Sequence, residues 1–270
     1  MNESRVTSLQ NQRVKDVVKL RDRRGREKQG RFIIDGRREL AAALAAGVSL
    51  LEAFVNPRFA EDPEAQRLLA ELSQGGTSLT EVTPLVWEKL TFGDRGGGIL
   101  AVATRAVASA ATLSAPAQGP MVVLDRVQKP GNIGAVLRTA DATAVSAVAL
   151  ADPQTDLFNP NVIRASLGTV FQVPVHVDSA SNLVDRLRVL GVEVIVARVD
   201  AELTLFDVDL TGPCAVVFGN EAEGVSELWR SPSMTGVRLP MLGSADSLNV
   251  STSAAAVLYE AVRQRHASGT

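Results

Sequence analysis

Hydrophobic and polar positions change their period along the first hundred residues, and the change predicts strands alternating with helices. The predicted strands are apolar runs of four to six residues, whereas the segments between them carry an apolar stripe or begin with proline, which suits the first turn of a helix. The predicted strands are residues 31–35, 50–55, 79–82 and 99–103, and the predicted helices are residues 11–23, 37–46, 63–73 and 84–90. This alternation indicates a small α/β domain in residues 1–105.

Residues 106–120 (AVASAATLSAPAQGP) carry no charge, and their hydrophobic positions follow neither a helix nor a strand period. They end in Gly-Pro, so they have the composition of a linker. The apolar run MVVLD at residues 121–125 then predicts a buried strand of a parallel sheet. Strands over residues 146–150, 173–177, 193–197 and 214–218 alternate with helices over residues 133–143, 162–167 and 181–190. We therefore expect a second domain in residues 121–270, with a mostly parallel sheet and helices on both faces.

Composition limits the chemistry that is open to the chain. Hydrophobic residues make up 46% of it without forming a long uncharged run, which predicts a soluble protein with no membrane span. The amino terminus lacks the apolar core of a secretory signal. Cys214 is the only cysteine and there are two histidines, so we expect neither a metal site nor a Ser-His-Asp relay.

Positive charge is concentrated at the start of the chain. Residues 1–38 hold 12 Lys and Arg against five Asp and Glu, although the formal net charge of the whole chain is −2. A basic arm on an acidic body is typical of a protein that binds a polyanion with one end. The alternative is a solvated helix, since Asp22 and Glu27 interrupt the basic run. The candidate nucleic-acid contacts are Arg21, Arg23, Arg24, Arg26 and Lys28.

Three segments combine glycine, amide and charged residues at predicted strand ends. In residues 129–138 (KPGNIGAVLR), glycines lie in a loop and at the start of a helix, where backbone N–H groups attract anions. This segment lacks the G-x-G-x-x-G spacing of a nicotinamide site. Residues 218–224 (FGNEAEG) follow a strand at the edge where parallel sheets bind ligands. Residues 239–260 (LPMLGSADSLNVSTSAAAVLYE) form a turn-rich loop before a helix that Asn249 caps.

In order along the chain, these segments resemble the three signatures of the SpoU-type RNA ribose methyltransferases, which belong to the SPOUT superfamily. Residues 31–44 (RFIIDGRRELAAAL) resemble the start of the RNA substrate-binding domain that many of these enzymes carry. The resemblance implies an α/β fold with a small amino-terminal RNA-binding domain and a mostly parallel-sheet domain that ends in a trefoil knot. It also implies S-adenosylmethionine as cofactor and a cytoplasmic homodimer whose active site is completed across the knot interface.

The resemblance assigns roles by position in each signature. Gly219, Leu239 and Leu248 are similar to cofactor-binding positions, and the positions similar to the catalytic set are Asn132, Arg138, Glu221, Ser247 and Asn249. In the usual proposal for the family, the arginine is the base. A free guanidinium stays protonated at physiological pH, so stabilisation of the developing alkoxide or a clamp on a phosphate is an alternative role for Arg138.

The implied function is transfer of a methyl group from S-adenosylmethionine to a ribose 2′-hydroxyl in RNA. The amino-terminal domain favours 23S ribosomal RNA as substrate, for housekeeping or for antibiotic resistance. The alternatives are a transfer RNA ribose methyltransferase and a knotted RNA-binding protein without catalysis. The presence of Arg138, Glu221 and Asn249 favours catalysis.

Overall fold

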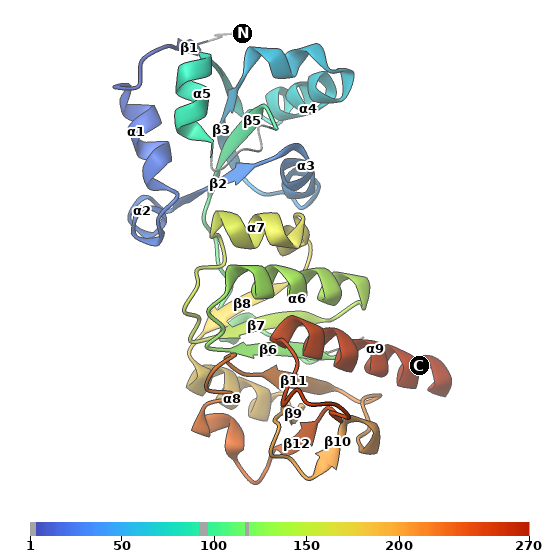
Figure 1. The fold of residues 1–270 in the computed structure, drawn as a ribbon. Coiled ribbons are helices and arrows are strands. Elements are labelled where there is room, and N and C mark those ends of the chain that lie inside the picture. Colours follow the sequence, from blue (N-terminus) through green and yellow to red (C-terminus); the bar gives the residue numbers. More distant parts are fainter. Residues whose placement is uncertain (1–3, 92–96, 117–118, 270) are drawn as a thin grey trace. The chain divides into compact units, whose positions relative to one another are not determined.

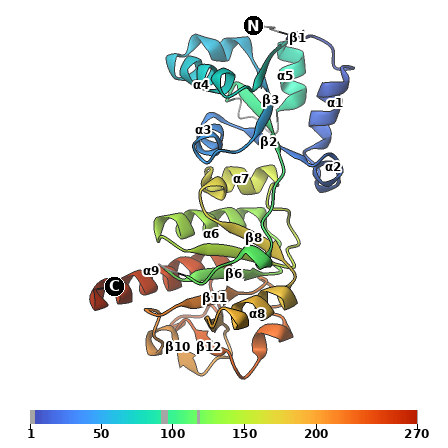
Figure 2. The same cartoon turned by 180° about the vertical axis from the view of Figure 1, so that it is seen from behind.

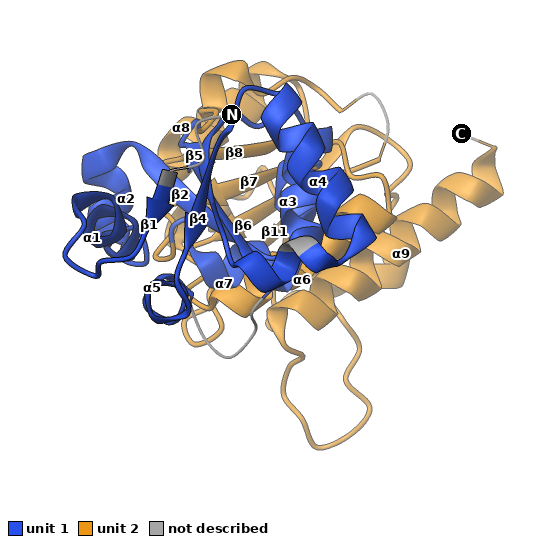
Figure 3. Ribbon diagram, turned by 90° about the horizontal axis from the view of Figure 1, so that it is seen from above, with its two compact units in different colours: residues 1–106, 156–172 blue, residues 107–155, 173–270 orange. Residues whose placement is uncertain are grey.

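A computed structural model describes residues 4–91, 97–116 and 119–269. The chain forms two compact units, which Figure 3 shows in different colours. Unit 1 comprises residues 1–106 and 156–172, and unit 2 comprises residues 107–155 and 173–270. Each unit has its own sheet.

Unit 1 is built on a five-stranded mixed sheet with the order β1-β4-β3-β5-β2. Strand β4 is parallel to β1 and β3, whereas β5 is antiparallel to β2 and β3. The strands are β1 (Ser4–Val6), β2 (Arg31–Asp35), β3 (Leu50–Val55), β4 (Ser78–Val82) and β5 (Ile99–Thr104). The helices are α1 (Gln12–Lys19), α2 (Arg23–Gln29), α3 (Arg37–Ala45), α4 (Pro63–Gln74), α5 (Pro84–Leu90) and α7 (Pro160–Ser166), with 3-10 turns at Pro57–Glu61 and Thr169–Phe171. This is the small α/β domain that the sequence predicts.

The single helix predicted over residues 11–23 is wrong, because the chain forms two helices that meet at a turn. α1 ends at Lys19 and α2 begins at Arg23. A Cβ atom on Gly25 would lie 1.9 Å from the Lys19 carbonyl oxygen, so the glycine lets α2 cross close to the end of α1. The basic stretch that follows the turn is therefore helical from Arg23 to Gln29.

Residues 156–172 lie between two strands of unit 2 in the sequence, but they pack within unit 1. Phe32 of β2 stacks on Phe158 and Phe171, with ring centroids 4.2 and 6.0 Å apart. A Cβ atom on Gly168 would lie 2.6 Å from Cβ of Ala42 in α3, which shows how closely the segment approaches that helix. The sequence pattern predicts residues 156–172 in the second domain, whereas their contacts group them with unit 1.

Unit 2 contains a seven-stranded sheet with the order β10-β12-β9-β11-β6-β7-β8. Every pair of neighbouring strands is parallel, as the apolar runs in the sequence predict. The strands are β6 (Met121–Asp125), β7 (Ala147–Ala151), β8 (Val175–Asp178), β9 (Glu193–Ala197), β10 (Leu203–Thr204), β11 (Cys214–Phe218) and β12 (Thr235–Arg238). The helices are α6 (Pro130–Ala142), α8 (Ala180–Val189) and α9 (Val250–Ser268), with 3-10 turns at Ala110–Thr112, Leu205–Asp207 and Glu227–Arg230.

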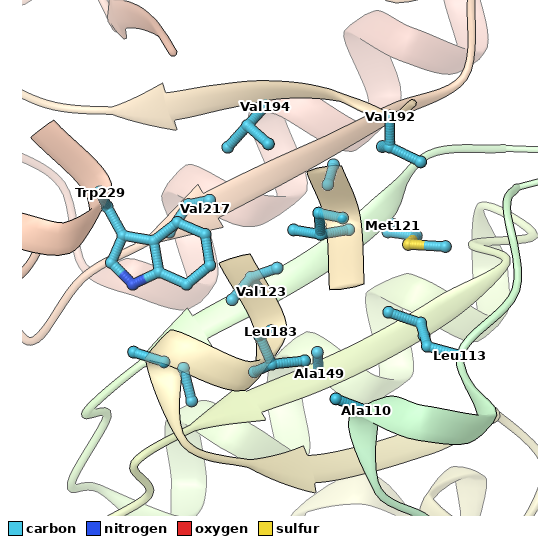
Figure 4. Close-up of a cluster of buried hydrophobic side chains, with 14 of the residues drawn as sticks. Ala110, Leu113, Met121, Val123, Ala149, Leu183, Val192, Val194, Val217 and Trp229 are labelled. Carbon is cyan, nitrogen blue, oxygen red and sulfur yellow. The ribbon is translucent and has the colours of Figure 1, made fainter. Parts of the chain in front are cut away.

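Helices cover both faces of this sheet, as predicted. α6 and α9 pack on each other on one face, and α8 covers the other (Figures 1 and 2). Alternate residues of the central strands, such as Val123 and Val217, point toward α8 and meet Leu183 and the fully buried Trp229 (Figure 4). The core therefore holds the carboxyl ends of the central strands in place.

The predicted linker, residues 106–120, contributes to unit 2. Ala110 and Leu113 are 3% and 1% exposed and belong to the same buried cluster as Trp229. Val177 of β8 also donates its backbone N–H to the carbonyl of Ala108. Residues 117 and 118 of the predicted linker lie outside the described residues. In the part of the chain that the structure describes, no helix is long and apolar enough to span a membrane.

Candidate active site

A pocket of about 780 Å³ lies at the carboxyl ends of β9, β11 and β12 in unit 2. This is the edge at which parallel sheets bind ligands, and the volume is within the range of small-molecule sites. Its walls are the segments that follow these strands, residues 197–200, 218–225 and 238–241, together with the turn into α9, residues 246–250. The predicted site residues that line it are Gly219, Glu221, Leu239, Ser247, Leu248 and Asn249. Lys129 also lines it, so all three signatures meet at one pocket.

The loop after β11 turns back on itself at Gly219. A Cβ atom there would lie 2.2 Å from the carbonyl carbon of Gly224 and 2.3 Å from the backbone nitrogen of Val225. No other residue type could take this position without moving the loop. Gly219 thus holds a backbone edge at the pocket wall, where a ligand can pack against the main chain.

Asn132, Glu221 and Asn249 connect all three signatures through side-chain hydrogen bonds. Asn132 donates its Nδ2–H to the Glu221 carboxylate, and its Oδ1 accepts a hydrogen bond of 3.2 Å from Nδ2 of Asn249. Asn249 also caps α9, because its Oδ1 accepts from the backbone N–H of Ser251 at 2.9 Å. Asn132 is 9% exposed, so this network fixes the orientation of a nearly buried amide beside the pocket.

Arg138 and Ser247 remain outside this network. Arg138 is exposed and lies six residues beyond Asn132 on α6, and it does not line the pocket. Among the described residues, none forms a hydrogen bond or an ion pair with the side chain of Arg138 or of Ser247. Ser247 lines the pocket with an exposed side chain. A single chain therefore brings together Asn132, Glu221 and Asn249 but not the proposed catalytic arginine.

Charged residues that the sequence analysis did not identify also line the pocket. Arg230 donates a hydrogen bond of 2.9 Å to Asp200, and Arg198 lies 3.5 Å from the same carboxylate. The hydrogen bond from Arg230 and the charge of Arg198 hold the pKa of Asp200 below its usual range. These three residues come from the loop after β9 and from a 3-10 turn, so only the fold brings them together. No sequence signal marked them.

The pocket suits the cofactor that the resemblance implies. S-adenosylmethionine combines an adenine ring, a ribose and a charged amino-acid group. Leu239, Met241 and Leu248 offer apolar surface, and the backbone edge at Gly219 offers hydrogen-bonding groups. In the described ranges, no group of three or more His, Cys, Asp and Glu side chains could hold a metal ion.

Four of the five candidate RNA contacts reach solvent, and one does not. Arg23, Arg24 and Lys28 are exposed, and Arg21 is half-buried with its guanidinium donating to the carbonyls of Lys89 and Thr91. Arg26 is 1% exposed, and its guanidinium forms hydrogen bonds within the protein. It donates to Asp156 at 2.5 Å and to the carbonyls of Leu20 and Arg21 at the end of α1. Arg26 is therefore unavailable to a phosphate in this structure.

Cys214 is in the apolar strand β11 and is 1% exposed. Burial raises the pKa of its thiol, which keeps the reactive thiolate scarce at neutral pH. A covalent attack by this cysteine on a nucleobase has no support in the structure.

Comparison with known proteins gives the family. Residues 119–259 match the model of the SpoU rRNA methylase family, and residues 11–101 match an MRM3-like substrate binding domain. The chain is 34% identical to the 23S rRNA (guanosine-2′-O-)-methyltransferase RlmB of Pseudomonas syringae over 212 residues, which cover 76% of this chain and 85% of that one. It is 39% identical to the 23S rRNA (uridine(2479)-2′-O)-methyltransferase of Streptomyces viridochromogenes, over about half of each chain (53% and 52%).

Among solved structures, the AdoMet-bound rRNA methyltransferase from Sinorhizobium meliloti aligns with a TM-score of 0.87 and 28% identity. The alignment covers 96% of this chain and 97% of that one. The two family models together span most of the sequence, and the similarity to RlmB extends across the junction between them. The chain belongs to the SpoU rRNA methylase family.

Proposed function

We propose that this protein transfers a methyl group from S-adenosylmethionine to a ribose 2′-hydroxyl of 23S ribosomal RNA. The observation that carries the proposal is the Glu221–Asn132–Asn249 network, which joins the three signatures beside a cofactor-sized pocket. The relatives named above act on 23S rRNA, and the first unit matches a substrate-binding domain. This substrate also supports the cytoplasm as the place of action.

The cofactor supplies the electrophilic methyl group on its sulfonium. Gly219, Leu239 and Leu248 hold it at the pocket, in part through backbone atoms. The ribose hydroxyl must be deprotonated or strongly polarised as it attacks, in line with the leaving sulfur. Ser247 and Asn249 hold the ribose, while Asn132 and Glu221 keep the amide of Asn249 oriented. Arg138 either accepts the proton or stabilises the developing alkoxide.

The proposal includes a homodimer and a carboxy-terminal trefoil knot. Arg138 is exposed and does not line the pocket of its own chain, which supports an arrangement in which Arg138 of a second copy completes the site. On α9, the exposed Tyr259 and Val262 offer apolar surface for such contact. The knot is supported by the meeting of residues 218–225 and 239–250 at one pocket and by the packing of α9 on α6.

The proposal is tested with an RNA fragment that carries the target nucleotide, once methylation mapping in cells with and without the protein has identified it. One 2′-deoxy substitution at that nucleotide should abolish methyl transfer, because it removes the accepting oxygen. Binding should change little, since phosphate contacts supply most of the affinity. Methylation of the deoxy fragment at the full rate would place the methyl group on the base and contradict the proposal.

A further inference from the structure

The loop after β11, residues 219–226, is held at both ends by two consecutive residues of unit 2, Asp125 and Arg126. Asp125 is the last residue of β6 and is fully buried, and its Oδ2 accepts a hydrogen bond of 2.6 Å from the backbone N–H of Ser226. Arg126 accepts a hydrogen bond of 3.0 Å from Nδ2 of Asn220 at its backbone carbonyl. The end of β6 therefore contacts the beginning and the end of the same loop.

Arg126 makes this contact from a conformation that L-amino acids disfavour. Its φ angle is +53°, in the left-handed region, and its backbone N–H donates to the carbonyl of Ala151 at 2.9 Å. That turn aims the Arg126 carbonyl at Asn220. The guanidinium lies 3.7 Å from the buried Asp125 carboxylate and also pairs with Glu223 at 3.0 Å. The Arg126 and Glu223 side chains both reach solvent (29% and 65% exposed), so that second pair contributes little. The backbone conformation is the feature that directs the contact.

Inside the loop, Asn220 connects the Arg126 carbonyl to the rest of residues 219–226 through its own hydrogen bonds. Its Oδ1 accepts from the backbone N–H groups of Ala222 and Glu223, at 2.8 and 3.3 Å. Its own backbone N–H and carbonyl pair with those of Gly224, at 3.0 and 2.9 Å. Asn220 is 6% exposed whereas residues 221–224 are exposed, so the buried Asn220 amide anchors a solvent-facing turn from within. Moving the Arg126 carbonyl would therefore shift the loop as one piece.

The loop contributes both to the cofactor pocket and to the Glu221–Asn132–Asn249 network. Gly219 forms a wall of the pocket, and Glu221 holds Asn132 through its hydrogen bond. We propose that Asp125 and Arg126 form a clamp on residues 219–226, and that the left-handed turn at Arg126 positions this loop for the cofactor and for Glu221. This inference rests on the proposed function, because it names positioning residues for that same reaction.

Four substitutions at one position test the clamp: Arg126→Gly, Arg126→Asn, Arg126→Ala and Arg126→Val. All four remove the guanidinium, but they differ in how readily the backbone adopts a positive φ angle. Glycine and asparagine adopt it most readily, alanine less so, and β-branched valine least. Titration calorimetry with S-adenosylhomocysteine should give dissociation constants within about threefold of wild type for the first two and at least about tenfold weaker for valine, with alanine between them.

Kinetics separate positioning from a general loss of folding. The KM for S-adenosylmethionine should rise in the same order as the dissociation constant. A merely structural role would reduce the active fraction, and so kcat, without changing that KM. Arg126→Gly and Arg126→Asn are the matched controls for the ion pair, because they remove it and still adopt the positive φ angle readily. If Arg126→Val does not fold, the dissociation constants of Arg126→Ala and Arg126→Gly are compared instead. These two variants differ by only one methyl group, so weaker binding by Arg126→Ala supports the clamp.

Equal cofactor affinity across the four variants would overturn the clamp. A wild-type protein that binds no S-adenosylhomocysteine would overturn the proposed function and the role of the clamp with it. Calorimetry on the wild-type protein therefore tests the proposed function separately, before any variant is made.

Discussion

At the scale of single residues, Arg138 lies apart from the groups with which it is proposed to act. It follows Asn132 by six residues on α6, so the two side chains leave the helix about 120° apart. Asn132 points into the network with Glu221 and Asn249, whereas Arg138 is exposed. This geometry allows Arg138 to be replaced without disturbing the pocket of its own chain.

We expect Arg138→Ala to slow methyl transfer by about a hundredfold or more, in line with the loss of one charge-stabilising donor. The affinity for S-adenosylhomocysteine should stay within about threefold, because Arg138 does not line the pocket. Arg138→Lys distinguishes the two roles. Activity that rises with pH would indicate proton transfer through a deprotonating lysine, and partial activity independent of pH would indicate charge stabilisation. A wild-type rate in Arg138→Ala would rule out both.

Six of the residues that line the pocket could be predicted from the sequence, because each belongs to a short signature with its own spacing. Gly219, Leu239 and Asn249 are examples. The positions of Arg26 and Arg126 could not be predicted, since an arginine in a basic run or after a strand is compatible with a solvated side chain. Arg26 is buried against Asp156, which is 130 residues away in sequence, and the carbonyl of Arg126 meets Asn220, which is 94 residues away. Such distant partners leave no local pattern.

At the scale of elements, α2 connects the basic stretch to residues 156–172 within unit 1. One face of α2 carries the exposed Arg24 and Lys28. The other face carries Arg26, whose guanidinium binds the Asp156 carboxylate and the two carbonyls that follow α1. The same helix thus offers cations to solvent and supplies a buried ion pair that holds its own unit together.

Arg26→Met should therefore destabilise unit 1 by about 3 kcal/mol or more, because the only cation that it leaves beside the buried Asp156 carboxylate is the more distant Arg105, at 3.6 Å. Adding Asp156→Asn should recover part of this loss by removing the charge. Hydrogen exchange, followed over the amides of α1 and β2, measures both effects. Unchanged protection in Arg26→Met would mean that the pair does not stabilise the unit.

Arg24→Met is the matched control on the same helix. Because Arg24 is exposed, its removal should change the free energy of unfolding by less than about 0.5 kcal/mol. It should instead weaken RNA binding at low salt and reduce the salt dependence of that binding by about one phosphate contact. A variant with the RNA affinity and salt dependence of wild type would indicate that the exposed cations of α2 are only solvated.

At the scale of the whole molecule, the sequence predicts two α/β units but not which residues belong to each. The hydrophobic periods of strands and helices can be recognised within short segments. They are therefore sufficient to predict the parallel sheet of unit 2 and the small α/β domain of unit 1. The grouping of residues 156–172 with unit 1 depends on Phe158 and Phe171 meeting Phe32. Aromatic residues near a short helix can pack on either sheet. The hydrophobic pattern therefore predicts residues 156–172 in the same domain as the strands on either side of them in the sequence.

This grouping leads to a prediction about truncation. A protein that lacks residues 1–106 keeps residues 156–172 but loses the groups on which they pack. Phe158 and Phe171 lose Phe32, and Asp156 loses Arg26 and Arg105. We expect the truncated protein to expose this apolar surface, to bind a hydrophobic dye and to aggregate as its concentration rises.

A second truncated protein isolates the cause. It also lacks residues 1–106, but an equally long Gly/Ser segment replaces residues 156–172 and behaves as a flexible connection. It should stay dispersed in light scattering and bind S-adenosylhomocysteine, because every residue that lines the pocket belongs to unit 2. Its RNA affinity should be weak, since it lacks the basic helix α2. If the first truncated protein is equally well dispersed and binds no dye, residues 156–172 do not depend on unit 1, and the single boundary predicted near residue 106 is sufficient.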